Sequence, residues 1–244
     1  DIYGGYTTEA SFGKGFKESS ISRESVKYIS KCGIKYIYEK RPNYVKHYDY
    51  SKKYIIDSTE QSLKKLKTNY LDLLLLHRPS PLMHSEEVAE AFMKLKNEGK
   101  VNSFGVSNFT PIQINLLSTE NLIEWNQIEC SLTQSKHMFD GLLDFMITNK
   151  INAMAWNPLG DYFKEKSQSK ERIKKALNPL IEKYESTEDQ LLLAWLLKHP
   201  AQIIPVVGTT SLERLKDSFS SLNIDLSTED WFSLLEASWG NKVP

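Results

Sequence analysis

Three side chains of this sequence, Tyr3, Lys31 and His77, could together transfer a proton. A free phenol has a pKa of about 10, which is too high for an efficient proton donor at neutral pH. A nearby ammonium group favours the phenolate and so lowers this pKa, and a buried neutral imidazole can orient a carbonyl oxygen. The combination predicts a site that protonates a carbonyl oxygen while hydride arrives at the carbonyl carbon.

Each of the three residues also has a structural interpretation. Tyr3 is one of 12 tyrosines, and its position alone does not single it out. His77 follows an apolar run and, taken alone, is more simply a core histidine with its hydrogen bonds satisfied. Lys31 is harder to explain structurally, because lysine is seldom buried without a partner. Taken together, the three residues favour catalysis.

The elements that must position these residues alternate between strands and helices. Strands are predicted near residues 28, 70, 101, 127, 151 and 203. The apolar run Tyr70–Leu76, stopped by His77 and a proline, is typical of a parallel strand buried on both faces. Helices are predicted over 55–66, 88–97, 110–117, 142–147, 173–184, 187–198, 211–222 and 227–235. This alternation, without hairpin dipeptides, predicts a parallel sheet with covered faces.

The predicted fold class is α/β, specifically a (β/α)8 TIM barrel. Such a barrel takes roughly 250 residues, so the 244 residues are expected to form one domain, 1–244. A barrel needs eight strands, and only six are predicted. The missing strands are expected at the start, where Asp1-Ile2-Tyr3 is expected to end a strand. N-terminal strand–helix units are therefore expected to be missing from this sequence. The long basic loop 34–54 is predicted to be a lid or binding loop.

Charge and cysteine content exclude several classes of function. Lys+Arg and Asp+Glu are both 31, so net charge favours neither nucleic acid nor an acidic membrane surface as a partner. The two cysteines, without a CxxC, make a disulfide framework or a cysteine zinc site improbable and favour a reducing, cytoplasmic setting. The sequence shows neither an apolar membrane-length stretch nor a signal peptide, and no motif predicts a metal. A GxGxxG dinucleotide motif after a strand is also missing.

Seven ordered segments carry a family resemblance. They are DIYGGYTTEASFG, ISKCG, YLDLLLLHRPSPLM, GKVNSFGVSNFTP, WNQIE, MAWNPLG and IPVVGTTSLERL. In this order they resemble the motifs of the aldo-keto reductase superfamily, above all its bacterial short-loop oxidoreductases, and they cover the chain nearly end to end. The resemblance implies that Tyr3 is the general acid, that Lys31 depresses its pKa, and that His77 positions the carbonyl.

The same resemblance implies NADPH as the cofactor. Ser107, Asn108 and Gln127 match the positions that hold the nicotinamide carboxamide, and Trp156 matches the aromatic residue that stacks on the ring. Arg214 is expected to bind the 2′-phosphate, since a guanidinium can bind phosphate with two parallel bonds. The remaining matched positions, on the pyrophosphate loop and at the adenosine end, are Asn157, Pro158, Leu159, Gly160, Gly208, Thr209, Thr210, Asp217 and Ser218.

The sequence departs from the family pattern at a few positions. The family's catalytic aspartate stands five residues before the tyrosine, which falls upstream of Asp1, and Asp1 itself matches a different aspartate. Gly208 stands where some members have a lysine, so 2′-phosphate binding is expected to depend on Arg214 and Thr209. Asn157 stands where serine is commoner.

These features predict a monomeric or weakly oligomeric reductase that converts an aldehyde or ketone to an alcohol. The alternative from another class is a nucleotide-binding regulatory protein on the same barrel with little or no turnover. A barrel isomerase or lyase is a second alternative, but it leaves Ser107, Asn108, Gln127 and Trp156 together unexplained. The sequence does not specify the physiological substrate.

Overall fold

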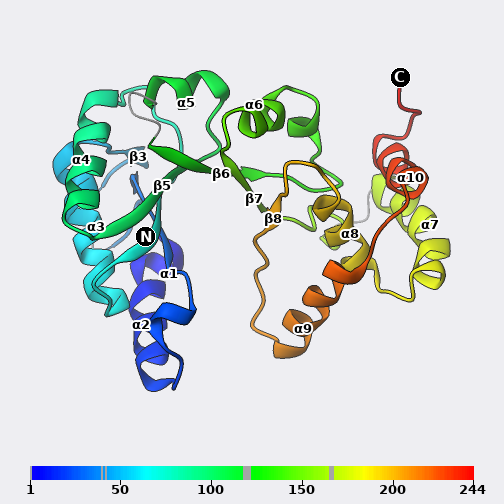
Figure 1. Ribbon diagram of the computed structural model, residues 1–244, viewed down its shortest axis with the longest axis horizontal. Coiled ribbons are helices and arrows are strands. Elements are labelled where there is room, and N and C mark those ends of the chain that lie inside the picture. Colours follow the sequence, from blue (N-terminus) through cyan, green and yellow to red (C-terminus); the bar gives the residue numbers. More distant parts are fainter. Residues whose placement is uncertain (1, 40, 42, 118–121, 165–167) are drawn as a thin grey trace. The chain divides into compact units, whose positions relative to one another are not determined.

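The apolar run after Tyr70 forms strand β4 (Leu71–Leu76), in which every residue except Asp72 is buried. β4 pairs in parallel with β1 (Ile29–Cys32) and with β5 (Val101–Ser107). The computed structural model describes residues 2–39, 41, 43–117, 122–164 and 168–244. These residues divide into two compact units, unit 1 before Gln127 and unit 2 from Gln127 onward. Figure 1 shows the elements of each unit.

Helices cover the strands of unit 1. They are α1 (Tyr3–Tyr6), α2 (Thr8–Glu18), α3 (Lys52–Leu66), α4 (Ser85–Asn97) and α5 (Pro111–Leu117), with a 3-10 turn at Arg23–Ser25. Apolar residues at helical spacing turn Ile55 and Leu63 of α3, and Val88 and Phe92 of α4, toward the core. Phe92 stacks on Phe104 of β5 with ring centroids 4.1 Å apart, which fixes α4 against the sheet.

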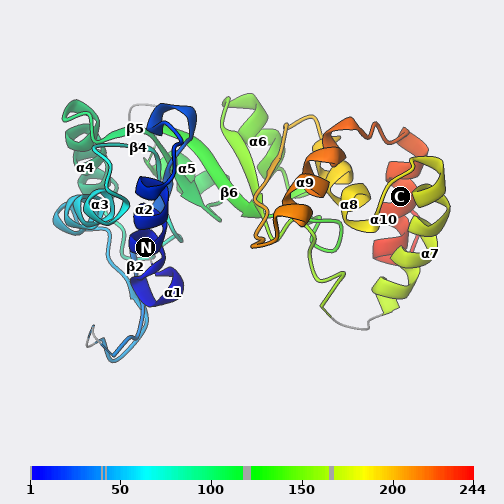
Figure 2. The same cartoon turned by 90° about the horizontal axis from the view of Figure 1, so that it is seen from below.

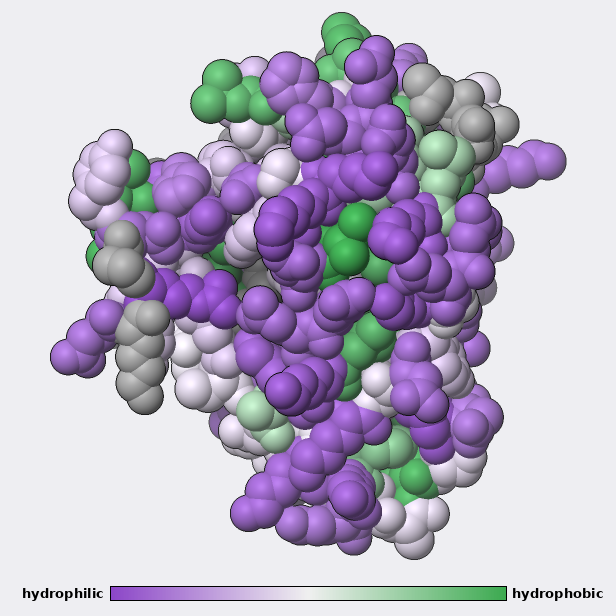
Figure 3. Space-filling model, turned by 90° about the vertical axis from the view of Figure 1, so that its left-hand side faces the viewer, coloured by the Kyte–Doolittle hydropathy of each residue, from purple (hydrophilic) through white to green (hydrophobic). Residues whose placement is uncertain are grey.

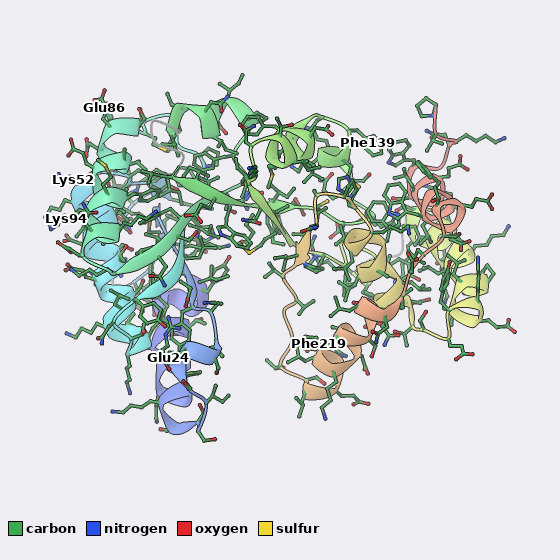
Figure 4. The ribbon with its side chains drawn as sticks, viewed as in Figure 1. Glu24, Lys52, Glu86, Lys94, Phe139 and Phe219 are labelled. Carbon is green, nitrogen blue, oxygen red and sulfur yellow. The ribbon has the colours of Figure 1, made fainter. Side chains whose placement is uncertain are left out.

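The outer faces of α3 and α4 carry ion pairs. Lys52 Nζ lies 2.7 Å from Glu90, and Lys94 pairs with Glu98, which directly follows α4. Lys52, Glu86 and Lys94 lie along the outer margin of these helices in Figure 4, and the face of unit 1 drawn in Figure 3 is mostly hydrophilic. The polar stripe between the apolar positions therefore faces solvent.

Helix α2 packs unusually closely on α3. A Cβ added to Gly13 of α2 would lie 2.3 Å from the backbone oxygen of Lys65, so this position requires glycine. Beside it, the buried Glu9 accepts a hydrogen bond from Ser30 of β1 at 2.7 Å and pairs with Lys65 at 3.3 Å. Helix α2 was not predicted from the sequence, because its apolar residues Phe12 and Phe16 form only a short stripe, which packs on Tyr28.

Unit 2 continues the alternation of strands and helices. Strand β6 (Ile123–Glu129) contributes residues to both units. The strand order up to it is β1-β4-β5-β6, and the order after it is β6-β7-β8. Strand β7 (Asn152–Trp156) pairs in parallel with the short β8 (Ile204–Pro205). The helices are α6 (Leu142–Thr148), α7 (Gln168–Lys183), α8 (Glu188–Leu197), α9 (Leu212–Ser220) and α10 (Thr228–Trp239), with 3-10 turns at Lys136–Met138 and Ser221–Asn223.

Two indole rings hold α8 and α10 together in unit 2. Trp195 and Trp231 stack with centroids 4.7 Å apart, and each indole N–H donates to the backbone oxygen of the other residue. Arg172 of α7 donates to the backbone oxygens of Ala237 and Ser238, which satisfies carbonyls at the C-terminus of α10.

The predicted α/β class and the six predicted strands are confirmed, and so are the eight predicted helices to within a few residues at their ends. Closure into an eight-stranded barrel is not observed among the described residues. That residues 1–244 form a single domain stays a prediction. No helix in the described part of the chain is both long enough and apolar enough to cross a bilayer.

One expectation about local structure was wrong, and one pair of strands was not predicted. The residues before Gly4 do not end a strand, since Tyr3 begins the four-residue segment α1, in which Gly4, Gly5 and Tyr6 have positive φ angles. Asp1 lies outside the described residues. The loop 34–54 contains an antiparallel hairpin, β2 (Ile34–Lys35) and β3 (His47–Tyr48). Its connection is far longer than a two-residue turn, so it lacks the dipeptide that marks a short hairpin in a sequence.

Candidate active site

Tyr3, Lys31 and His77 converge in unit 1. The Tyr3 hydroxyl lies 3.3 Å from Nε2 of His77, and Nζ of Lys31 donates to the same hydroxyl at 3.5 Å. The Tyr3 and His77 rings are tilted by 41°, with centroids 5.6 Å apart. Residues separated by 28 and 74 positions in the sequence therefore surround one phenolic oxygen.

Parallel strand pairing places two of these residues at one edge of the sheet. Lys31 lies opposite Leu75, and Cys32 opposite Leu76, in the register of β1 and β4. His77 follows directly, and its backbone N–H donates to the Cys32 oxygen at 2.9 Å. Functional groups of parallel α/β barrels gather at this carboxyl edge of the strands.

The three residues differ in exposure and in pKa. Burial, and then the cations of Lys31 and Arg78, lower the pKa of His77 to about 3, so its imidazole is neutral near pH 7. Burial and Arg78 lower the pKa of Lys31 to about 8. Burial raises the pKa of Tyr3, with Arg78 opposing this shift, although 53% of the residue's surface is exposed.

The pKa of Tyr3 therefore differs from the sequence-based expectation, which had Lys31 lowering it. The physical reason is desolvation, which penalises the phenolate of the partly buried ring more than the Arg78 cation stabilises it. The neutral imidazole of His77 agrees with the expected role in orienting an oxygen atom.

Two residues not predicted from the sequence, Tyr50 and Gly33, fix the backbone of Arg78, which follows His77. Tyr50 is buried, and its hydroxyl donates to the backbone oxygen of Arg78 at 2.5 Å and accepts from the Arg78 N–H at 3.1 Å. The Tyr50 ring occupies the space beside Gly33, whose added Cβ would lie 2.0 Å from it. Gly33 has φ of +110°. Gly33 itself, two residues after Lys31, was the one signal in the sequence for this packing.

Ser107 and Asn108 end strand β5, also in unit 1. Ser107 is buried, and the Asn108 side-chain amide donates to its hydroxyl at 2.9 Å. Asn108 has φ of +61°, a conformation in which asparagine is enriched among non-glycine residues. The left-handed turn redirects the chain from β5 into the segment before α5.

The remaining predicted cofactor residues belong to unit 2. Gln127 is buried on β6, and Trp156 ends β7. Asn157, with φ of +55°, donates to Glu129 at 3.2 Å and accepts from Lys164 at 3.3 Å. Pro158 and Leu159 complete the turn to Gly160, whose N–H donates to the Asn157 oxygen at 2.8 Å.

Gly160 needs to be glycine in this turn. Its φ is +59°, and an added Cβ would lie 2.0 Å from Thr133 Oγ1 and 2.6 Å from Ser131 Oγ. The Asp161 N–H donates to the same Thr133 oxygen at 3.1 Å. The turn after β7 is thus packed tightly against the segment that follows β6.

The segment predicted to bind the adenosine end surrounds the start of α9. Gly208, Thr209 and Thr210 are exposed, and open space surrounds the Cα of Gly208. Ser211 caps α9 by accepting from the Arg214 N–H at 3.3 Å. Arg214 and Asp217 are exposed on the helix.

Ser218 lies further along the same helix. Its hydroxyl donates to the Arg214 oxygen within α9 at 2.8 Å. It lines an apolar cavity of about 400 Å³ between α8, β8 and α9, together with Phe219, which Figure 4 labels on α9. Among the described residues, those that line this cavity are apolar apart from Gln202, Ser218 and Ser221.

The structure thus brings Tyr3, Lys31 and His77 into contact. The other predicted residues lie on or after strands β5, β6 and β7, in the loop before α9, or on α9 itself, each within its own unit. The described residues form no cluster of His, Cys, Asp and Glu that could hold a metal ion.

Comparison with known proteins identifies the family. Residues 1–238 match the model of the Aldo/keto reductase family. The oxidoreductase YcsN of Bacillus subtilis (strain 168) is 41% identical over 251 residues, which cover 100% of this chain and 83% of the relative. A 6-dehydroglucose reductase of Agrobacterium fabrum is 37% identical over 248 residues, covering 100% of this chain and 82% of the relative.

A solved structure agrees with these relatives. The crystal structure of an aldo/keto reductase from Klebsiella pneumoniae in complex with NADP and acetate superimposes with a TM-score of 0.77 and 25% identity, covering 98% of this chain and 78% of that chain. On this evidence of sequence and fold, the chain belongs to the aldo/keto reductase family and is an oxidoreductase.

Proposed function

We propose that this protein reduces an aldehyde or ketone to an alcohol, with NADPH as the hydride donor and Tyr3 as the general acid. The observation that carries the proposal is the Tyr3 hydroxyl, which lies 3.3 Å from His77 and 3.5 Å from Lys31. The Klebsiella relative was crystallised with NADP, and the Agrobacterium relative is named as a reductase. Both support the same chemistry here.

The residues of this chain have the chemical groups that a nicotinamide nucleotide needs. Asn108 and Gln127 offer amides that could bind a carboxamide, and Trp156 offers a ring for stacking. Arg214 is exposed in the first turn of α9, and open space surrounds the Cα of Gly208. Helix N-termini and arginine side chains both favour phosphate. When bound, NADPH would supply a hydride to the substrate carbon.

The protein's own groups would handle the proton. Neutral His77 would hold the carbonyl oxygen near the Tyr3 hydroxyl, and Tyr3 would give its proton to that oxygen as the alcohol forms. Lys31, which donates to Tyr3, would stabilise the phenolate that remains. Because Tyr3 is half-exposed, solvent can return the proton afterwards.

The proposal is tested by titrating the protein with NADPH while following tryptophan emission, and then assaying small aldehydes and ketones. Saturable quenching together with oxidation of NADPH is expected. Absence of quenching would contradict the cofactor assignment. Quenching without turnover of any carbonyl compound would favour the alternative, a nucleotide-binding regulatory protein. Gel filtration with light scattering would test separately whether the protein is a monomer or a weak homo-oligomer, as we propose.

Cofactor preference should depend on Arg214. Replacing Arg214 with Gln is expected to weaken NADPH binding by about 10-fold, since charge-assisted hydrogen bonds are the strong ones and this site is exposed. The affinity for NADH, which lacks the 2′-phosphate, should stay unchanged. Lys216→Gln, an exposed change on the same helix, is the matched control. An equal loss of affinity for NADPH and NADH would show that Arg214 does not bind the 2′-phosphate.

A further inference from the structure

The proposed general acid is followed by a turn in an uncommon backbone conformation. Gly4, Gly5 and Tyr6 have φ angles of +57°, +60° and +67°. Glycine adopts this left-handed conformation easily, but a bulky residue such as tyrosine seldom does. Such a residue persists where the surrounding structure holds it in place, so the contacts of Tyr6 determine the geometry beside Tyr3.

Hairpin β2–β3 provides these contacts. The backbone N–H of Tyr36 donates to the Tyr6 hydroxyl at 2.9 Å. The guanidinium of Arg41 lies 3.8 Å from the centre of the Tyr6 ring, and the Tyr38 ring meets it edge-on with centroids 5.9 Å apart. Figure 2 shows the hairpin extending from unit 1 near α1.

The turn and the hairpin also fit each other at Gly5. A Cβ at this position would lie 2.7 Å from Cε2 of Tyr38, so the Tyr38 ring packs directly against the backbone of the turn. Within the hairpin, Asn43 donates to the Tyr36 oxygen at 3.1 Å, and the Asp49 N–H donates to the Gly33 oxygen at 2.9 Å. The hairpin is thereby joined to the end of strand β1.

Tyr3 depends on this arrangement because its own side-chain contacts are weak. Its hydroxyl contacts at 3.3 and 3.5 Å are long for hydrogen bonds between side chains, and half of its surface is exposed. A rotation of the turn would therefore move the hydroxyl away from His77 with little resistance from Tyr3 itself.

We propose that Tyr6 is a positioning residue: through its contacts with hairpin β2–β3 it holds the Gly4–Tyr6 turn and keeps the Tyr3 hydroxyl beside Lys31 and His77. The proposal rests on the proposed role of Tyr3 as general acid. It assigns the hairpin a function in aligning the acid, in addition to the lid or binding function that the sequence predicts.

The first test is Tyr6→Phe, which keeps the ring contacts with Arg41 and Tyr38 and removes the hydrogen bond from Tyr36. One neutral hydrogen bond corresponds to about a 5-fold effect, so kcat for a small aldehyde should fall by about 5-fold. NADPH affinity should not change. The solvent deuterium isotope effect on kcat should rise, because proton transfer from a misplaced Tyr3 becomes slower than the other steps.

The second test is Tyr6→Gly, which accepts the positive φ without strain but loses every side-chain contact with the hairpin. We expect kcat to fall by about 100-fold, the effect of a displacement of about 1 Å, while the melting temperature stays close to that of the wild type. Tyr44→Phe is the matched control on the same hairpin, because Tyr44 is 97% exposed. It should leave kcat and the isotope effect unchanged.

Wild-type kcat in both Tyr6 variants would overturn the positioning role, and so would a loss of kcat without a larger isotope effect. Tyr3→Phe, assayed in parallel, separates this failure from failure of the proposed function. If Tyr3→Phe retains full turnover, the acid is misassigned. If Tyr3→Phe abolishes turnover and the Tyr6 variants do not reduce it, only the positioning role is wrong.

Discussion

Replacing Tyr3 with Phe is expected to lower kcat for carbonyl reduction by about 100- to 10,000-fold, the range typical of a lost general acid. Phenylalanine retains the ring that lies 5.6 Å from the His77 ring and loses the hydroxyl that contacts both His77 and Lys31. NADPH affinity should be unaffected, because the substitution removes a group assigned to the substrate oxygen. Stopped-flow measurement of NADPH oxidation, with a parallel binding titration, measures both quantities.

The pH dependence of the wild type provides an independent check. The pKa of Tyr3 lies above its ordinary value because of burial, so the phenol stays protonated through neutral pH. Lys31, with a pKa of about 8, loses its charge first as pH rises, so reduction should slow from about pH 8 upward as the phenolate of Tyr3 loses this support. His77, with a pKa of about 3, should contribute no change between pH 5 and 8. In Tyr3→Phe the alkaline decline should disappear from the residual rate. A variant that keeps the wild-type rate and pH profile would mean that another group donates the proton.

The largest expected loss of stability follows from replacing Arg23 with Met. The Arg23 guanidinium lies between the rings of Tyr28 and Tyr70, 3.9 and 4.1 Å from their centres. It donates to Asp72 at 2.8 Å and to Thr68 at 2.9 Å. The side chains of Arg23 and Asp72 are only 15% and 10% exposed. Methionine would leave the Asp72 carboxylate desolvated, and we expect the free energy of unfolding to fall by about 3 kcal/mol.

This loss should depend on pH in a defined direction. Burial alone would raise the pKa of Asp72, but hydrogen bonds from the Tyr28 N–H, Arg23 and Lys27 lower it below its ordinary value. A carboxyl group with a lowered folded-state pKa stabilises the fold above its unfolded pKa, and this stabilisation is lost as pH falls through the folded value. The difference between wild type and Arg23→Met should therefore be largest near pH 7 and shrink in acid.

Urea unfolding at pH 7 and at pH 4 would measure both effects. Lys53→Gln removes an exposed ion pair with Asp57 on α3 and should have little effect, since exposed pairs contribute little. The double variant Arg23→Met with Asp72→Asn should recover part of the loss, because the largely buried carboxylate that lost its Arg23 partner is replaced by a neutral amide. Equal losses for Arg23→Met and Lys53→Gln would contradict the assigned importance of this buried pair.

Local sequence patterns predicted most of the elements. Buried strands such as Leu71–Leu76 and amphipathic helices such as α4 are encoded in runs of neighbouring residues, so their positions follow from hydrophobic periodicity. The polar residues that end apolar strands, Lys31 and His77, were found in the same way. The hairpin β2–β3 and helix α2 were not predicted, because long-range packing of Tyr38 on Gly5 and of Gly13 on α3 stabilises them.

The sequence by itself determined the fold class, the family resemblance and the types of group available for catalysis. Only the tertiary structure decided the direction of the pKa shift of Tyr3, the hydrogen bond from Tyr50 to the Arg78 backbone, and the hydrogen bond from hairpin β2–β3 to Tyr6. The physical reason is that hydrophobic periodicity is a property of adjacent residues. Desolvation and hydrogen bonding instead depend on atoms that meet after residues tens of positions apart have been brought together, as Tyr3 and His77 are.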